Sequence, residues 1–112
     1  MHELALSRSI ASIVARAAEG RRVAVVELAV GDLRQVVPST LERCWALLCA
    51  GTALEASRLA IRRCPGVIRC DDCGATTRLA ELPILRCEAC QSTTVHIVSG
   101  EEFLVTALQL ED

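Results

Sequence analysis

Two Cys-x-x-Cys pairs constrain this chain more than any other feature. Cys70 and Cys73 form the first pair and Cys87 and Cys90 the second. Each such turn points both sulfurs the same way, and Gly74 permits a tight turn with positive φ after the first pair. Two facing turns would surround one tetrahedral ion, which we expect to be Zn²⁺ rather than iron. Because four thiolates leave no open position for water, the predicted role is structural.

Two other uses of these cysteines fit less well. A thioredoxin-like redox pair would stand at the start of a helix within a βαβ pattern, and neither pair has that context. Zinc ribbons also bind nucleic acid, but these turns carry Asp71, Asp72 and Glu88 where phosphate contacts need Lys or Arg. The whole chain has 14 acidic and 12 basic residues. We therefore expect no nucleic-acid partner.

The first half of the chain predicts two helices and a strand. Apolar residues recur every three or four positions over 6–17, which indicates a helix that ends near Gly20. The β-branched run over 23–30 predicts a buried strand. A second helix is expected from Pro38-Ser39, because Ser39 and Glu42 have the spacing of a capping box.

The second half predicts three strands, over 58–62, 95–98 and 103–110. Together these elements predict an α+β fold, a small mixed sheet packed on two helices with an inserted zinc-ribbon lobe. Residues 1–66 and 95–112 would form an α/β domain, and residues 67–94 the zinc-binding domain. An insert of that size cannot fold on hydrophobic burial alone, so the metal would hold it together.

Cysteine usage and hydropathy indicate a cytoplasmic protein. The count of seven cysteines is odd, and the paired spacing favours metal thiolates in a reducing compartment over disulfides. No apolar run is long enough to span a bilayer, and acidic Glu3 stands where a signal peptide would be basic. We expect no membrane partner.

The amino-terminal residues form a candidate site for a second metal. We expect Met1 to be retained before His2, so that the α-amine, the His2 amide nitrogen and the His2 imidazole can form fused chelate rings. Such nitrogen ligands favour square-planar Ni²⁺ or Cu²⁺, and Glu3 can add its amide or a carboxylate oxygen. A histidine at position 2 is, however, more often a frayed terminal residue. The residues alone leave both interpretations open.

Several motifs together resemble the HypA/HybF family of hydrogenase maturation factors over essentially the whole chain. They are Met1-His2-Glu3-Leu4, the strand 23–31, Val37-Pro38-Ser39-Thr40-Leu41, the two cysteine pairs and Val98-Ser99-Gly100-Glu101-Glu102. The resemblance implies an accessory protein that delivers Ni²⁺ to the large subunit of [NiFe]-hydrogenase with the GTPase HypB. It implies nickel on His2, with Met1 and Glu3 nearby, and zinc on Cys70, Cys73, Cys87 and Cys90. A homodimer is left open.

Four residues with metal-binding side chains lie outside these motifs. Cys44 and Cys49 are roughly 140° apart around a helix, so they cannot easily share a metal, and with Cys64 they are expected to be buried small hydrophobes. We expect His96 to face solvent or to be hydrogen-bonded rather than to bind nickel.

Two other classes of function are possible for such a chain, an enzyme and a protein–protein adaptor. No recognisable motif pairs a Ser or a Cys with a His, which argues against an enzyme. The remaining alternative is a zinc-ribbon protein–protein adaptor without nickel function, which would use the four cysteines but not His2.

Overall fold

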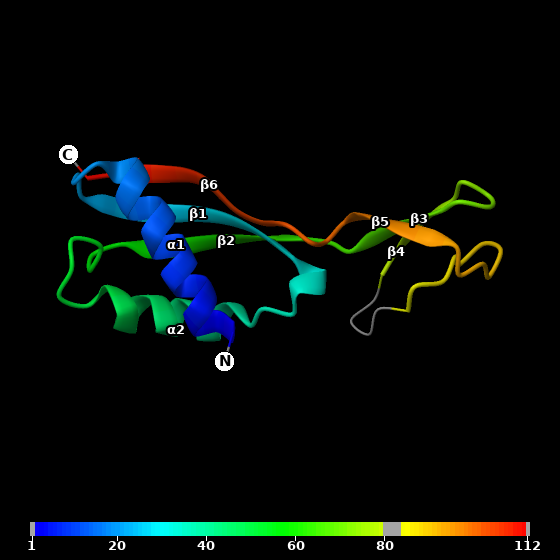
Figure 1. Cartoon of the computed structure of the whole chain (residues 1–112), viewed down its shortest axis with the longest axis horizontal. Helices are drawn as coiled ribbons and strands as arrows, with labels where there is room; N and C mark the ends of the chain where they lie inside the picture. The colour runs from blue at the N-terminus through cyan, green and yellow to red at the C-terminus, as the bar shows by residue number, and fades with distance from the viewer. Residues whose placement is uncertain (1, 80–83, 112) are drawn as a thin grey trace. The chain divides into compact units, whose positions relative to one another are not determined.

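The computed structural model describes residues 2–79 and 84–111 and shows the mixed α+β fold predicted from the sequence (Figure 1). The chain divides into two compact units, each described here by itself. Unit 1 comprises Met1–Ala29, Val36–Arg62 and Leu104–Asp112, and unit 2 comprises Val30–Gln35 and Arg63–Phe103. The elements are α1 (His2–Ala18), β1 (Val23–Gly31), a 3-10 turn η1 (Asp32–Arg34), α2 (Pro38–Cys49), β2 (Arg58–Cys64), β3 (Val67–Cys70), β4 (Thr76–Arg78), β5 (Val95–Ser99) and β6 (Phe103–Leu110).

The helices and the first sheet lie in unit 1. The sheet has the strand order β2-β1-β6. Strands β1 and β2 run in the same direction and are connected through α2, whereas β6 runs the opposite way (Figure 1). This is the small mixed sheet that the pattern of elements predicts. Within the described residues, no helix has the length and apolarity needed to cross a membrane.

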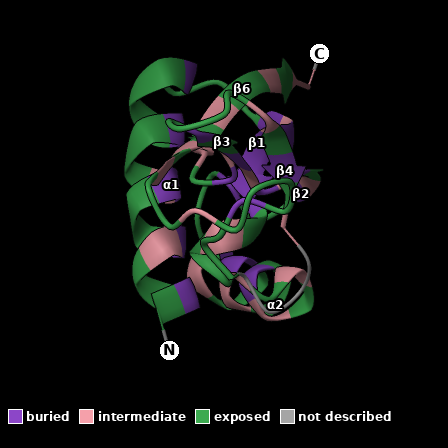
Figure 2. Ribbon diagram, turned by 90° about the vertical axis from the view of Figure 1, so that its right-hand side faces the viewer, coloured by how far each residue is buried: buried purple, intermediate pink, exposed green. Residues whose placement is uncertain are grey.

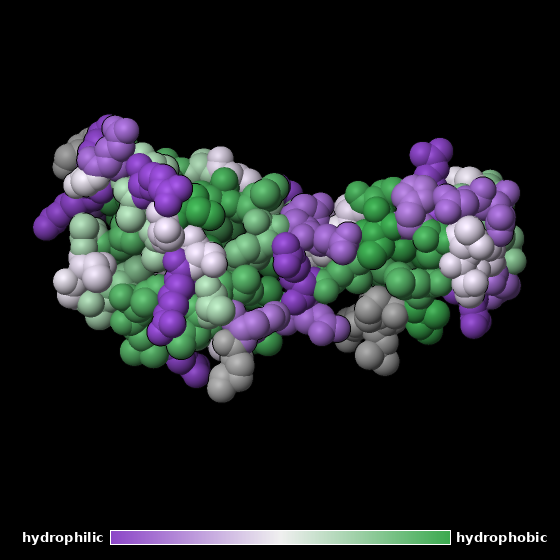
Figure 3. All heavy atoms as spheres, viewed as in Figure 1, coloured by the Kyte–Doolittle hydropathy of each residue, from purple (hydrophilic) through white to green (hydrophobic). Residues whose placement is uncertain are grey.

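Aliphatic residues build the core of unit 1 around one tryptophan. Trp45 is 2% exposed, and its indole Nε1 donates a hydrogen bond to Ser57 Oγ at 3.0 Å, so its one polar atom is satisfied. Figure 2 shows buried residues along the inner sides of both helices. Some large apolar side chains stay outside this core, Ile13 and Leu47 among them, and apolar surface is visible over the helices in Figure 3.

The start of α2 differs from the predicted capping box. The helix begins at Pro38, its N-cap is Val37, and no side chain of that residue caps it. Ser39 is therefore the second residue of the helix, two positions beyond the N-cap, and cannot act as the cap. The amide of Val37 donates to a side chain from α1, the carboxylate of Glu3, which makes the bond expected from the Glu42 side chain.

Unit 2 contains a second sheet, which is antiparallel with the order β4-β3-β5. Ile68 in β3 is fully buried and lies between Thr77 of β4 and Ile97 of β5. The sequence predicts residues 95–112 as part of the helical domain, but the pairing of β5 with β3 puts β5 in unit 2. The limits of unit 2 are consequently wider than the expected 67–94.

Three glycines allow segments of unit 2 to meet closely. A Cβ atom on Gly31 would lie 1.9 Å from the carbonyl oxygen of Gly100, and one on Gly100 would lie 2.6 Å from the Cα atom of Gly66. Leu33 packs against the last two glycines, and its amide donates to the Gly100 carbonyl at 2.9 Å. The absence of side chains here is what lets the backbones approach.

Candidate metal centres

The two cysteine turns of unit 2 have the same backbone geometry. In the first, the amide of Gly74 donates to the Cys70 carbonyl at 3.0 Å, and in the second the amide of Gln91 donates to the Cys87 carbonyl at 2.9 Å. Both donors have positive φ, +77° at Gly74 and +67° at Gln91. Sequence reasoning identified the glycine but missed Gln91, because glutamine carries no signal for this conformation.

These turns bring all four predicted sulfur ligands together. Every pair of Sγ atoms lies within 4.8 Å, and the Cys70–Cys90 and Cys73–Cys87 pairs are each 3.6 Å apart. Four sulfurs bound to one tetrahedral zinc at about 2.3 Å would be about 3.8 Å apart. The spacing therefore fits a single four-coordinate ion.

The ionisation of the crowded thiols also favours a cation. A hydrogen bond from the Cys90 backbone lowers the pKa of Cys87 to about 7. The Ser92 backbone likewise favours the Cys90 thiolate, but the Cys70 sulfur and burial outweigh it and raise the pKa of Cys90 to about 12. Four thiolates at these distances repel one another, and a divalent ion at their centre removes that penalty.

Polar residues next to the cysteine cluster are bonded to one another. His96 in β5 is hydrogen-bonded to Asp71 of the first turn, with 2.8 Å between Nδ1 of His96 and Oδ1 of Asp71. Ser92 donates its hydroxyl to the carboxylate of Asp72. His96 is thus a half-exposed, hydrogen-bonded histidine, one of the two roles expected for it.

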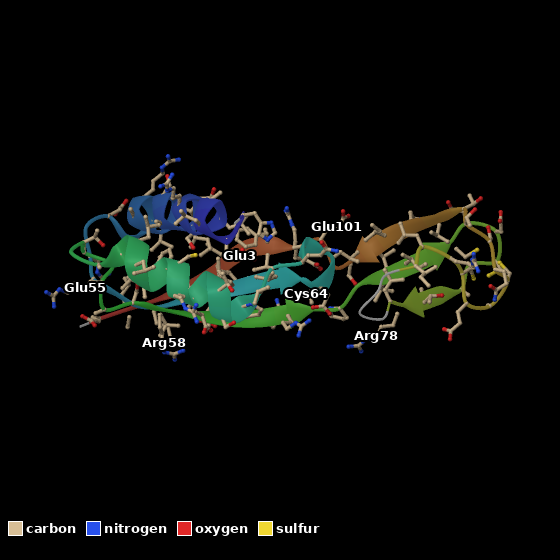
Figure 4. The ribbon with its side chains drawn as sticks, turned by 90° about the horizontal axis from the view of Figure 1, so that it is seen from below. Glu3, Glu55, Arg58, Cys64, Arg78 and Glu101 are labelled. Atoms are coloured by element: carbon tan, nitrogen blue, oxygen red, sulfur yellow. The ribbon has the colours of Figure 1, made fainter. Side chains whose placement is uncertain are left out.

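The amino-terminal candidate site lies in unit 1, at the first turn of α1. His2 has a side chain 50% exposed, and its Nε2 is 3.2 Å from Oε2 of Glu3. Glu3 is 5% exposed and also accepts a hydrogen bond from the Val37 amide at 3.2 Å. Figure 4 labels Glu3 between the start of α1 and the start of α2. Met1, the other expected contributor, lies outside the described residues.

Glu3 keeps its negative charge at unusually low pH. The charged amino terminus of the chain and the hydrogen bond from Val37 lower the pKa of Glu3 to about 2. Its carboxylate therefore contacts both the Val37 amide at the start of α2 and the His2 ring. The link to Val37 could not be read from the sequence, because 34 positions separate the two residues.

The other cysteines lie apart from the four candidate metal ligands. Among the described residues, the one group of three or more potential ligands is the cluster Cys70, Cys73, Cys87 and Cys90. Cys49 and Cys64 are 2% and 6% exposed, and Cys44 is half-buried. Burial raises the pKa of Cys49, so this thiol stays protonated and packs as a small apolar group.

The fold and the four-thiolate cluster define a small α+β metal-binding protein, and comparisons with known proteins identify its family. The model of the family described as "Hydrogenase/urease nickel incorporation, metallochaperone, hypA" matches residues 1–110. The chain belongs to this HypA family. Because the family consists of metallochaperones and maturation factors, the prediction that the chain is not an enzyme is confirmed.

Relatives agree with this assignment, and a solved structure has the same fold. The chain is 40% identical to "Hydrogenase maturation factor HypA" of Geobacter sulfurreducens, over 99% of this chain and 100% of that protein. It is 36% identical to the protein of the same name from Streptomyces avermitilis, over 100% of this chain and 88% of that protein. The solution structure of "the Ni metallochaperone HypA from Helicobacter pylori" shares the fold, with a TM-score of 0.69, 20% identity and coverage of 98% and 97%.

Proposed function

We propose that the protein carries Ni²⁺ on its amino-terminal segment for the maturation of [NiFe]-hydrogenase and holds a structural Zn²⁺ on its four clustered cysteines. The nickel ligands would be the His2 imidazole and amide, with Met1 supplying its amine and Glu3 an accessory role. Membership of a nickel-incorporation family supports the cargo. The position of His2 in the structure supports the site.

The contact between His2 and Glu3 is the observation that favours this site. With Nε2 of His2 directed at the Glu3 carboxylate, the ring nitrogen left for a metal is Nδ1. Nδ1 is the nitrogen that closes a six-membered chelate ring with the amide nitrogen of the same residue. A carboxylate that receives the second ring N–H is the usual companion of a metal-binding histidine, because it fixes the tautomer and the ring orientation.

The same contacts refine the accessory role of Glu3. Its side chain already accepts the Val37 amide, so its support for nickel would come from orienting His2 and from its own backbone amide. Nickel could therefore bind without breaking the hydrogen bond between the Glu3 carboxylate and the Val37 amide.

Zinc is proposed for the cysteine cluster on the chemistry of its donors. Four thiolates in a closed tetrahedral arrangement suit Zn²⁺, which needs no open position to stabilise a fold. The partners that would follow are a HypB-like GTPase and the hydrogenase large subunit, and reduced thiolates fit the cytoplasm as the place of action.

A nickel titration of protein with an untagged amino terminus tests the proposal. His2→Ala should abolish nickel binding, because it removes the imidazole and its chelate ring, while zinc stays bound. His96→Ala is the matched control, since it removes the other histidine of the chain and should bind nickel normally. Extension of the amino terminus by a few residues should weaken binding, because the amine is displaced.

The outcome also separates the two candidate functions. If His2→Ala binds nickel as tightly as the native protein, the proposed nickel site is wrong and the zinc-ribbon adaptor is the better interpretation. Loss of binding in both histidine variants would instead move the site to a pair of histidines and refute a purely terminal site.

A further inference from the structure

The four sulfurs of the cysteine cluster differ in their access to solvent. Cys70 and Cys87 are 3% and 1% exposed, whereas Cys73 and Cys90 are classed among the exposed residues. The first cysteine of each turn is thus buried and the second is open to solvent. An oxidant that arrives from solvent therefore meets the second cysteine of each turn first, because oxidation of a sulfur depends on its exposure.

Two close pairs of sulfurs run from one turn to the other. The Sγ atoms of Cys70 and Cys90 are 3.6 Å apart, as are those of Cys73 and Cys87. Each pair joins one exposed sulfur to one buried sulfur. The S–S bond of a disulfide is about 2 Å long, so a small movement is enough to form one in either pair. An accessible cysteine beside a second cysteine that can resolve it is the arrangement of a redox sensor.

Hydrogen bonds without sulfur also join the two turns. The amide of Asp71 in the first turn donates to the carbonyl of Thr94 at 2.9 Å, beyond the second turn. The hydroxyl of Ser92 donates to the carboxylate of Asp72. Because these bonds need no metal ligand, they favour the same sulfur pairs while the ligands are being oxidised.

We propose that the cysteine cluster is a peroxide-sensitive switch, in which Cys73 and Cys90 are oxidised first and form disulfides across the turns with Cys87 and Cys70, releasing the metal. This inference rests on the proposed zinc site and adds regulation to it. The reduced form holds Zn²⁺, and the oxidised form holds two disulfides in its place.

Each disulfide forms in two balanced steps. The Cys90 thiolate attacks hydrogen peroxide, an S–O bond forms, the O–O bond breaks, and the hydroxide that leaves takes up a proton to become water. The Cys70 thiolate then attacks the sulfenic sulfur of Cys90, the S–S bond forms, the S–O bond breaks, and the second hydroxide also becomes water. Cys73 and Cys87 react in the same way. Two peroxides and four protons convert four thiolates into two disulfides and four waters.

Loss of the metal follows from the change in its ligands. A thiolate binds zinc through its negative charge, which a sulfur in a disulfide no longer carries. Once either disulfide has formed, only two of the four thiolates that a closed zinc site requires are left. A dithiol reductant opens the disulfides by exchange and restores the ligands, so the switch is reversible.

Peroxide treatment of the zinc-loaded full chain tests the proposal. A coloured zinc indicator should report the release of one zinc per chain as disulfides form, and a dithiol reductant should allow zinc to bind again. A dimedone-type probe for sulfenic acids should label Cys73 and Cys90 but not Cys70 or Cys87. Cys44→Ala is the matched control, because it removes a half-buried cysteine outside the cluster and should release zinc at the native rate.

Peptide mapping without reduction identifies the disulfides. Trypsin cleaves after Arg78 and Arg86 and so separates the two turns. Disulfides between the turns should hold the two peptides together, whereas disulfides within a turn would leave them apart. Acidic residues lie between the two cysteines of each turn, so an enzyme that cleaves at Asp and Glu separates all four. The pairs recovered should be Cys70 with Cys90 and Cys73 with Cys87.

Each contrary result overturns the proposal. Disulfides within the turns, or sulfenic acid on Cys70 or Cys87, would contradict the proposed order and pairing. Zinc that stays bound during peroxide treatment, or that is lost without recovery on reduction, would exclude a reversible switch. Failure of the zinc assignment itself looks different, because the native protein would then contain no zinc before peroxide is added. The His2 titration tests nickel binding separately.

Discussion

The carboxylate of Glu3 accepts a hydrogen bond from the backbone amide of Val37 and lies 3.2 Å from the ring nitrogen of His2. One side chain thus joins the first turn of α1, the N-cap of α2 and the candidate nickel ligand. In a capping box the N3 side chain accepts the amide of the N-cap residue, and here Glu3 makes that bond to Val37 from another helix. His2, the candidate nickel ligand, is consequently tied to the fold of unit 1 through Glu3.

This link predicts a pH-dependent contribution to stability. The pKa of Glu3 is lowered from 4.5 to about 2, so the folded state favours the carboxylate. Its stabilisation is complete above pH 4.5 and is lost as the pH falls towards 2. Urea unfolding should show native protein more stable than Glu3→Gln at neutral pH, and the gap should close over that acidic range. Glu42→Gln, which alters the expected but unused capping residue, should leave stability unchanged at neutral pH.

Metal removal should unfold unit 2 and spare the helices. The sheet β4-β3-β5 has few buried apolar residues besides Ile68, so its free energy of folding must come largely from the metal. Elemental analysis should find one zinc per chain. A chelator, or Cys73→Ser together with Cys90→Ser, should expose the amides of β3 and β5 to hydrogen exchange while helical circular dichroism is kept. A unit 2 that stays ordered without zinc would contradict the structural role.

The three cysteines outside the cluster should be dispensable for both metals. Cys44→Ala, Cys49→Ala and Cys64→Ala should leave zinc and nickel stoichiometry unchanged. Cys49→Ala should destabilise the protein by about 1 kcal/mol, because it opens a small cavity under α2. A thiol reagent should modify Cys49 more slowly than Cys44 in the folded state, since burial raises its pKa and blocks access. If any of these variants lost zinc or nickel, the substituted cysteine would be a metal ligand, and its assignment to packing would be wrong.

The glycine contact in unit 2 should tolerate no side chain. Gly31 has φ −74°, which any residue adopts, so its requirement is space beside the Gly100 carbonyl. Gly31→Ala should cost about 2 kcal/mol or more, because a backbone has to move. Gly20→Ala is the comparison. Gly20 has φ +82°, but a Cβ atom added there would meet no other atom within 4 Å, so this variant should lose only about 1 kcal/mol of stability. Equal unfolding midpoints for the two variants would refute the steric explanation.

Local chemistry determined what could be predicted from the sequence of this protein. The sequence predicts one cluster of the four cysteines Cys70, Cys73, Cys87 and Cys90, because each Cys-x-x-Cys turn by itself points its two sulfurs in the same direction. The strand at 103–110 was predicted at its observed limits, because β-branched and aliphatic residues between turns carry a strong local signal. Helices and most strands follow from patterns that lie within a dozen residues.

Only the tertiary structure decided the relationships between distant segments. The N-cap of α2 is Val37 rather than Ser39, and the amide of Val37 donates to a carboxylate supplied by α1. Strands β3 and β4 have four and three residues, too few for a periodic signal, and they exist because β5 returns to pair with β3 and completes their sheet. Backbone hydrogen bonds between strands and close approaches between glycines leave almost no trace in local sequence, since they depend on which segments the folded chain brings together.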